Sequence, residues 1–328
     1  MPKVSVVMPV FNGEHYISAA MDSVLAQRNT DLELIVVNDG STDKTLEILQ
    51  TYGTRDARVS VINRPNSGRP SFPKNDGIAA ARGDYVCFLD HDDLYDPDRT
   101  WQMVEALDRH PDWVAAFHDL RMINSDGALL PGTYLSDGNF LQRAQSFLAP
   151  LDDGLYECGE SFFVYQSLVT GALHTQSVLI ALNRIPAGTV QFDTQFTICD
   201  DTDLWIRLGM SGKMGYLDQV LSSYRQHESS ITRNREKFLL DTLRLHQHNF
   251  QRVETHLSSS ELNRYRARIS SCFSDLGYFH YLQYRLDDSR EAYRKSLTWS
   301  FNQGACKGYL KTLIPKGVLR GLKGLASR

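Results

Sequence analysis

The first ninety residues alternate short apolar runs with helix-period patterns, and no other feature of the sequence constrains the fold as strongly. The predicted strands are Val4 to Met8, Leu32 to Val37, Val59 to Ile62 and Tyr85 to Leu89. Apolar side chains recur three and four residues apart from Ile17 to Leu25, the spacing of a helix with one buried face, and we expect Asn12 to cap it. Strands that alternate with helices predict βαβ units and a parallel sheet.

Three carboxylates lie within four residues where the fourth predicted strand ends, in Asp90-His91-Asp92-Asp93. Like charges at this density repel one another, so the cluster is best explained by a bound cation. Carboxylate oxygens suit Mg²⁺ or Mn²⁺, and Mg²⁺ usually binds one or two carboxylates together with a substrate's phosphates. Helix capping is the alternative, but Asp96-Pro97 already supplies an N-cap and a first-turn proline. The motif therefore predicts a metal-bound nucleotide diphosphate.

Other polar residues are expected to lie near this cluster. Asp39 also follows a predicted strand, and open α/β sheets bind ligands at the carboxyl ends of their strands. The loop from Arg64 to Asn75 is rich in turn formers and carries three cations. Such a loop can contact phosphate or ribose, although a plain surface connection fits its composition nearly as well.

Length, charge and cysteine content narrow the class of protein. The 328 residues exceed one typical domain, and the formal net charge of −4 gives no basic footprint for nucleic acid. The five cysteines form no CxxC pair, which argues against a disulfide framework or structural zinc and fits a reducing compartment. No stretch approaches the ~18 apolar residues of a spanning helix, and the N-terminus runs straight into a strand. We therefore expect a cytoplasmic protein, soluble or peripheral on the cytoplasmic membrane face.

A second acidic cluster, Asp200 to Asp203, begins a predicted helix in which Leu204 and Leu208 share one face. First-turn acids often serve only the helix dipole, contributing ~0.3–1 kcal/mol each. Three acids in four residues exceed what capping requires, so this cluster could supply a base to the site that the first cluster begins. The intervening segment 131–165 has little periodicity, which is typical of a functional loop or a mobile one.

From about residue 236 the pattern changes to helices only. An apolar seam with alternating four- and three-residue spacing comprises Leu239, Leu243, His246, Phe250, Val253 and Leu257. Ser258 to Glu261 forms a capping box, and the segment from Leu276 to Leu297 is similar to one tetratricopeptide helix pair. We predict two domains, residues 1–235 and a helical appendage, residues 236–328.

The last twenty-eight residues carry six Lys or Arg and no acid, interleaved with apolar residues. This mixture favours contact with an anionic membrane surface. A merely solvated tail is the alternative.

Four stretches together resemble the family 2 glycosyltransferases, inverting enzymes of the GT-A fold. They are Val6 to Asn12, Val36 to Asp43, Phe88 to Asp93 and Asp200 to Arg207, and they occur in the family's order. The resemblance implies an α/β fold: a Rossmann-like, mostly parallel sheet flanked by helices, with the all-helical appendage outside it. It also implies transfer of a sugar from a nucleotide-diphosphate donor to a hydroxyl of a saccharide, lipid-linked or other acceptor, as in polysaccharide and cell-envelope biosynthesis.

The resemblance further implies roles for individual residues. The expected nucleotide-sugar-binding residues are Pro9, Val10, Phe11, Asp39, Asn75, Asp90, Asp92 and Asp93. Asp90 and Asp92 take the places of the family's DXD pair and would hold Mg²⁺ or Mn²⁺, Asp92 most directly. His227, in an element similar to the family's Tyr-Arg-x-His, could complete the metal shell. Asp201 falls where the family places its catalytic base, whereas Asp200 stands where that motif usually has glutamate.

Two other functions remain open at the level of sequence. A sugar nucleotidyltransferase also pairs a parallel sheet with metal-bound carboxylates, but it would favour a Gly-rich basic loop after the first strand, and the segment Pro9 to Gly13 is not one. A non-catalytic sugar-nucleotide-binding or scaffold protein would not need both acidic clusters. Fold alone does not decide among these functions.

Overall fold

The computed structural model describes residues 3–28, 31–152, 154–169, 173–227 and 234–314. The chain divides into two compact units, Met1–Ser230 and Ile231–Arg328. The domain boundary that we predicted between residues 235 and 236 lies beside the start of helix α9 (Arg235–Val253). We describe each unit by itself.

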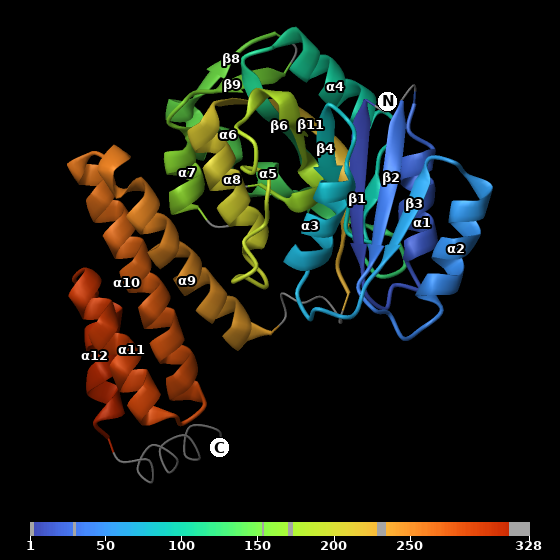
Figure 1. The fold of residues 1–328 in the computed structure, drawn as a ribbon. Coiled ribbons are helices and arrows are strands. Elements are labelled where there is room, and N and C mark those ends of the chain that lie inside the picture. The colour runs from blue at the N-terminus through green and yellow to red at the C-terminus, as the bar shows by residue number, and fades with distance from the viewer. Residues whose placement is uncertain (1–2, 29–30, 153, 170–172, 228–233, 315–328) are drawn as a thin grey trace. The chain divides into compact units, whose positions relative to one another are not determined.

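In the first unit, eleven described strands form one sheet, in the order β3-β2-β1-β4-β10-β6-β11-β9-β8 with β5 on β11 and β7 on β6 (Figure 1). They are β1 (Val4–Val10), β2 (Leu32–Asn38), β3 (Val59–Asn63), β4 (Tyr85–Phe88), β5 (Leu94–Tyr95), β6 (Trp113–Ile123), β7 (Leu129–Thr133), β8 (Leu148–Pro150), β9 (Leu155–Cys158), β10 (Val178–Ala181) and β11 (Lys213–Arg225). The four N-terminal strands are parallel, as predicted. Strand β10 runs antiparallel between β4 and β6, and β6 is parallel to β11.

Helices cover both faces of this sheet. They are α1 (Ile17–Leu25), α2 (Thr45–Arg55), α3 (Ser71–Ala80), α4 (Arg99–Arg109), α5 (Tyr134–Asp137), α6 (Phe140–Ala144), α7 (Phe162–Leu168) and α8 (Asp200–Ser211). Apolar side chains of α1, α2 and α4 share one core with Val6 and Met8 of β1, whereas those of α5 to α8 share a second core with Val7. Successive side chains of a strand point to opposite faces, so a strand covered on both sides is apolar throughout. The predicted α/β class is confirmed.

Two predicted helix starts are wrong. Asn12 lies four residues before the N-cap of α1, in a left-handed conformation with φ 52°, and its Oδ1 accepts a hydrogen bond of 2.8 Å from the Thr42 backbone N–H. Helix α4 begins at Arg99 rather than after Asp96, whose carboxylate pairs instead with Arg121. In both cases the side chain that local spacing predicted to cap a helix instead contacts a residue more than twenty positions away in the sequence.

The segment 131–165 is built from short elements around one buried carboxylate. Asp119 of β6 accepts hydrogen bonds from Thr133 Oγ1 at 2.6 Å, from the Leu135 N–H at 2.7 Å and from the Ser136 N–H at 3.1 Å. These bonds fix the turn from β7 into α5. Elements of three to seven residues, such as β8 and α7, are too short for periodicity to reveal them.

The second unit contains α9, α10 (Ser259–Leu282), α11 (Leu286–Trp299) and α12 (Gln303–Thr312). The predicted seam residues of α9 are buried, and the capping box of Ser258 and Glu261 is confirmed. The Tyr293 ring packs where a Cβ added to Gly277 or Gly308 would approach it within 2.8 and 2.2 Å. Most of the predicted basic tail, residues 315–328, lies outside the described residues. Among the described helices, none combines the length and apolarity needed to cross a bilayer.

Candidate functional site

The predicted ligand-binding residues follow three adjacent parallel strands. Strand β1 pairs with β2 on one side and β4 on the other, so the chain ends of these strands meet where the strand order reverses. Asp39 follows β2 and Asp90 follows β4, while Phe11 follows β1 and is 45% exposed. Such a switch point is where open α/β sheets form a ligand crevice. Pro9 and Val10 are buried within β1.

Asp39 and Asn75 both hold neighbouring loops. The Asp39 carboxylate accepts hydrogen bonds from Ser67 N–H at 3.1 Å, Ser67 Oγ at 2.8 Å and Arg64 Nη1 at 3.2 Å. The Asn75 amide donates to the Phe192 carbonyl and accepts from the Phe192 N–H, both at 2.8 Å. The cation-rich loop therefore folds back onto the end of β2, beside the switch point. Ser67 carried no signal in the sequence analysis, because only the fold brings it to Asp39.

Asp92 and His227 are in contact although 135 residues separate them. Asp92 Oδ2 lies 2.7 Å from His227 Nε2. The pairing of β5 with β11 brings the two motifs together, since Ser223 opposes Leu94. Burial raises the pKa of Asp92, but the hydrogen bond to His227 and the charges of His91 and His227 outweigh it, so the pKa of this carboxyl is lowered. Asp92 is thus held as a carboxylate.

Arg225 donates hydrogen bonds to Asp92 and Asp93 of the acidic motif after β4. Its Nε donates to the Asp92 carbonyl and its backbone N–H to Asp93 Oδ1, each at 2.8 Å, and its guanidinium lies 4.8 Å from the Tyr16 ring centroid. Asp93 is fully buried, and its Oδ2 has no hydrogen-bond partner among the described residues. Burial, together with the charges of Asp92 and Asp90, raises the pKa of Asp93 well above its ordinary value. Asp93 therefore supports Arg225 from inside the protein and exposes no surface to a ligand.

The donor atoms present fit a divalent cation that is shared with a diphosphate. No group of three or more His, Cys, Asp and Glu side chains within the described ranges is arranged to hold a metal by itself. A cation that bridges phosphates needs only one or two protein ligands. Asp92 and His227 supply an oxygen and a nitrogen side by side, and Asp90 stands two residues away at the same strand end.

Lys74 of α3 lies between the two acidic clusters. Its Nζ is 3.2 Å from Asp200 Oδ2, and both side chains are buried. The attraction of Asp200, Asp90 and Asp201 outweighs burial and raises the pKa of Lys74. Burial raises the pKa of Asp200 to about 6, against the opposing effect of the Lys74 charge. Lys74 thus lies near both the carboxyl end of β4 and the start of α8. The sequence analysis counted Lys74 only as one of three cations in a loop.

The three aspartates at the start of α8 have different partners. Asp200 pairs with Lys74, and the fully buried Asp203 pairs with Arg207 Nε at 2.9 Å. Asp201 is half-buried, and its Oδ2 accepts a hydrogen bond of 3.2 Å from Thr175 Oγ1. Of these three carboxylates, Asp201 contacts hydroxyl and amide donors, whereas Asp200 and Asp203 each pair with a cation.

Replacing Lys74 by methionine is expected to destabilise the protein by about 3–5 kcal/mol at neutral pH, because Asp200 would be left buried without its counterion. The pKa of Asp200 is higher in the folded state, about 6, than in the unfolded state. Protonation of Asp200 therefore stabilises the folded state, fully below pH ~4, and this stabilisation is lost as the pH rises through about 6. The destabilisation should therefore shrink as pH falls from 7 to 4. Chemical denaturation across this range measures both effects.

Lys3→Met is the matched control for this experiment. The Lys3–Asp108 pair is also a lysine–aspartate bridge, of 2.7 Å, but both side chains are more than 40% exposed. Its loss should cost only about 0–1 kcal/mol. Equal effects of the two substitutions would contradict a special cost at Lys74.

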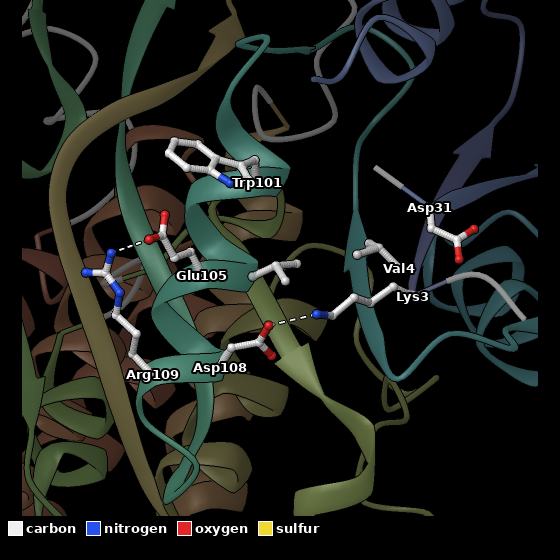
Figure 2. A pocket seen from close by; sticks show the side chains of 8 residues that line it. Lys3, Val4, Asp31, Trp101, Glu105, Asp108 and Arg109 are labelled. Atoms are coloured by element: carbon white, nitrogen blue, oxygen red, sulfur yellow. Dashed lines mark hydrogen bonds and ion pairs between the residues drawn. The ribbon is translucent and has the colours of Figure 1, made fainter. Parts of the chain in front are cut away.

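A cavity of about 560 Å³ lies elsewhere, near the start of β1 rather than its end. Its lining includes Lys3, Val4, Trp101, Glu105, Asp108 and Arg109 (Figure 2). Two ion pairs, Lys3 with Asp108 and Glu105 with Arg109, account for four of its five charged lining side chains, and Asp31 is the fifth. None of the predicted site residues lines this cavity.

Known proteins are similar to this chain in sequence and in fold. A family model described as glycosyl transferase family 2 matches residues 5–147. An uncharacterised glycosyltransferase of Rickettsia typhi is 29% identical over 231 residues, 70% of this chain and 66% of its own length. The chondroitin synthase of Pasteurella multocida is 34% identical over 134 residues, 41% of this chain and 14% of its own length. The matched part thus spans less than two thirds of each relative.

Two solved structures share the fold. TarS of S. aureus, residues 1–349 in complex with UDP-GlcNAc, matches with a TM-score of 0.65 and 15% identity over 94% of this chain and 89% of its own. A mannosyltransferase of Pyrobaculum calidifontis, in complex with GDP-Man and Mn²⁺, matches with a TM-score of 0.59 and 15% identity over 100% of this chain and 81% of its own. At these identities the likeness establishes the GT-A fold, and the family match, which spans the first three of the four motif stretches, confirms the resemblance to family 2 glycosyltransferases.

Proposed function

We propose that this chain, which carries a family 2 glycosyltransferase domain of the GT-A fold, transfers a sugar from a nucleotide-diphosphate sugar to an acceptor hydroxyl with inversion. One observation carries the proposal: the buried Lys74 pairs with Asp200 at the start of α8, and the charges of Asp90 after β4 and of the base candidate Asp201 also act on Lys74. A site with both a diphosphate-binding half and a proton-accepting half has the parts that this reaction needs.

The donor is expected to lie along the carboxyl ends of β1, β2 and β4. The exposed Phe11 ring can pack against the nucleobase. Asp39 can accept a hydrogen bond from the nucleobase or the ribose once Ser67 no longer donates to its carboxylate. The complexes of TarS with UDP-GlcNAc and of the mannosyltransferase with GDP-Man support a nucleotide-diphosphate sugar as the class of donor. Pro9, Val10 and Asn75 shape the walls of this subsite through the strand and loop that they hold.

Asp92 and His227, with Asp90 beside them, would hold Mg²⁺ or Mn²⁺. The cation, when bound, stabilises the charge that develops on the departing diphosphate. Arg225 fixes the backbone of Asp92, so its guanidinium and the buried Asp93 position the metal-binding carboxylate rather than touch the donor.

Asp201 is the proposed general base. The acceptor oxygen attacks the anomeric carbon on the face opposite the diphosphate, its proton passes to the Asp201 carboxylate, and the bond from the anomeric carbon to the diphosphate oxygen breaks. Thr175 orients the carboxylate through its 3.2 Å hydrogen bond. General-base catalysis of this kind contributes about 10²–10⁴-fold.

Turnover of defined donors tests the proposal. The protein is incubated with UDP-GlcNAc or GDP-mannose, with Mn²⁺ or with a chelator, and the release of UDP or GDP is measured. Metal-dependent release supports transfer or its hydrolytic side reaction. Exchange of pyrophosphate into the nucleotide sugar would instead indicate a nucleotidyltransferase, and donor binding without release would indicate a binding protein.

We also propose peripheral contact with the cytoplasmic membrane face through the C-terminal segment. Phe301 is 81% exposed, Leu310 63% and Leu313 56%, in a stretch whose charged residues are all basic. Replacing Leu310 and Leu313 by serine should reduce cosedimentation with phosphatidylserine vesicles, and higher salt should reduce it for the wild type. Equal sedimentation of both forms at low salt would leave a solvated tail.

A further inference from the structure

Three half-buried aromatic side chains from distant parts of the chain form one cluster. The rings of His174 and Tyr224 have centroids 4.5 Å apart, and the Tyr134 ring meets His174 edge-on at 5.4 Å. Tyr134 begins α5, His174 precedes the 3-10 turn η2 (Thr175–Ser177), and Tyr224 lies in β11. Each of the three side chains is half-buried, so the cluster is neither core nor open surface.

This aromatic cluster lies beside the proposed base. Thr175, which follows His174, donates its hydroxyl to Asp201 Oδ2. Burial and the nearby charge of Asp201 raise the pKa of Tyr134 to about 12. The charge of His174 in turn acts on Asp90. The cluster is therefore linked to Asp201 through Thr175, and the charge of His174 reaches Asp90 of the proposed donor half.

Hydrogen bonds and strand pairing fix the backbone beside the three rings. Tyr134 stands between Thr133 and Leu135, which both donate to the buried Asp119. The backbone at His174 is closed by Ser177, whose Oγ donates to the His174 carbonyl at 2.8 Å. Tyr224 is held in register with Met122 of β6. A backbone that is fixed at all three rings lowers the entropy cost of ordering them when a ligand binds.

We propose that Tyr134, His174 and Tyr224 form the acceptor subsite and bind a pyranose ring, so that the acceptor is a saccharide rather than a linear polyol or a lipid hydroxyl. This inference rests on the proposed function, because it places the acceptor by reference to Asp201. A pyranose has an apolar face of C–H groups that packs on aromatic rings, while its hydroxyls reach polar groups at the rim. A linear polyol has no such face.

Binding of methyl pyranosides tests the subsite without requiring turnover. Saturation-transfer NMR is recorded with methyl α- and β-glycosides of glucose, galactose and mannose, with glycerol as the linear control. Wild type should saturate the ring C–H protons of at least one pyranoside and not glycerol. Tyr134→Ala and Tyr224→Ala should each weaken that binding about 5- to 10-fold, Tyr→Phe at either position should retain most of it, and Tyr278→Ala on the exposed surface of α10 should change nothing.

The outcomes separate the two proposals. Pyranoside binding that depends on the rings, without any donor turnover, would support the subsite and count against the proposed function. Both proposals would be supported if the two alanine variants still turned over the donor with glycerol or water, while their KM for the pyranoside rose about 5- to 10-fold. Unchanged pyranoside binding and KM in the alanine variants would overturn the subsite, as would binding of none of the six pyranosides.

Discussion

Asp201→Asn is expected to reduce sugar transfer by about 10²–10⁴-fold while binding of the nucleotide-sugar donor is retained. Asparagine keeps the shape of the side chain and its capacity to accept the hydrogen bond from Thr175, but it cannot take the proton of the acceptor hydroxyl. Initial rates with saturating donor measure the loss, and calorimetric titration with UDP-GlcNAc or GDP-mannose measures the binding.

Asp203→Asn is the matched control, because Asp203 lies two residues away in the same helical turn. Asp203 is fully buried and paired with Arg207, so its loss should lower the melting temperature by more than it lowers turnover. Near-wild-type transfer by Asp201→Asn would refute the assignment of the base. A loss of activity that merely follows unfolding would refute it equally.

Asp92→Ala is expected to weaken Mn²⁺-dependent binding of UDP or GDP by on the order of 100-fold or more, because it removes the carboxylate held at His227 while leaving the sheet intact. Calorimetry with and without Mn²⁺ isolates the metal-dependent part of the affinity. The melting temperature of the apo protein is measured as well, so that a loss of affinity can be distinguished from a loss of folded protein.

Asp126→Ala, an exposed aspartate in the same unit, serves as the control for the loss of one negative charge. It should leave the metal-dependent affinity unchanged. If Asp92→Ala retained that affinity, the metal-binding role of the β4 motif would be wrong.

These predictions depend on an electrostatic balance that spans two elements. Lys74 is buried beside Asp200, and the negative charges of Asp90 and Asp201 also act on it. The same cation that stabilises the fold thus allows a dense group of carboxylates to persist before a metal or diphosphate binds. Like charges that a ligand will later neutralise need an internal counterion in its absence.

The alternation of apolar runs and helical periods in the sequence was sufficient to predict the α/β class and the four parallel strands, because a strand covered on both faces is apolar along its whole length. It was also sufficient to place Asp39 and Asp90 at carboxyl ends of strands, since those positions follow from local pattern alone. The capping box at Ser258 was predictable for the same reason: both of its partners lie within four residues.

Tertiary structure alone decided which side chains meet. The contact of Asp92 with His227 depends on the register of β5 against β11, and the burial of Lys74 beside Asp200 depends on how α3 and α8 pack. The same long-range partners explain the wrong caps at Asn12 and Asp96. No local pattern encodes contacts between residues about a hundred positions apart, because the free energy that selects them comes from closing the whole core.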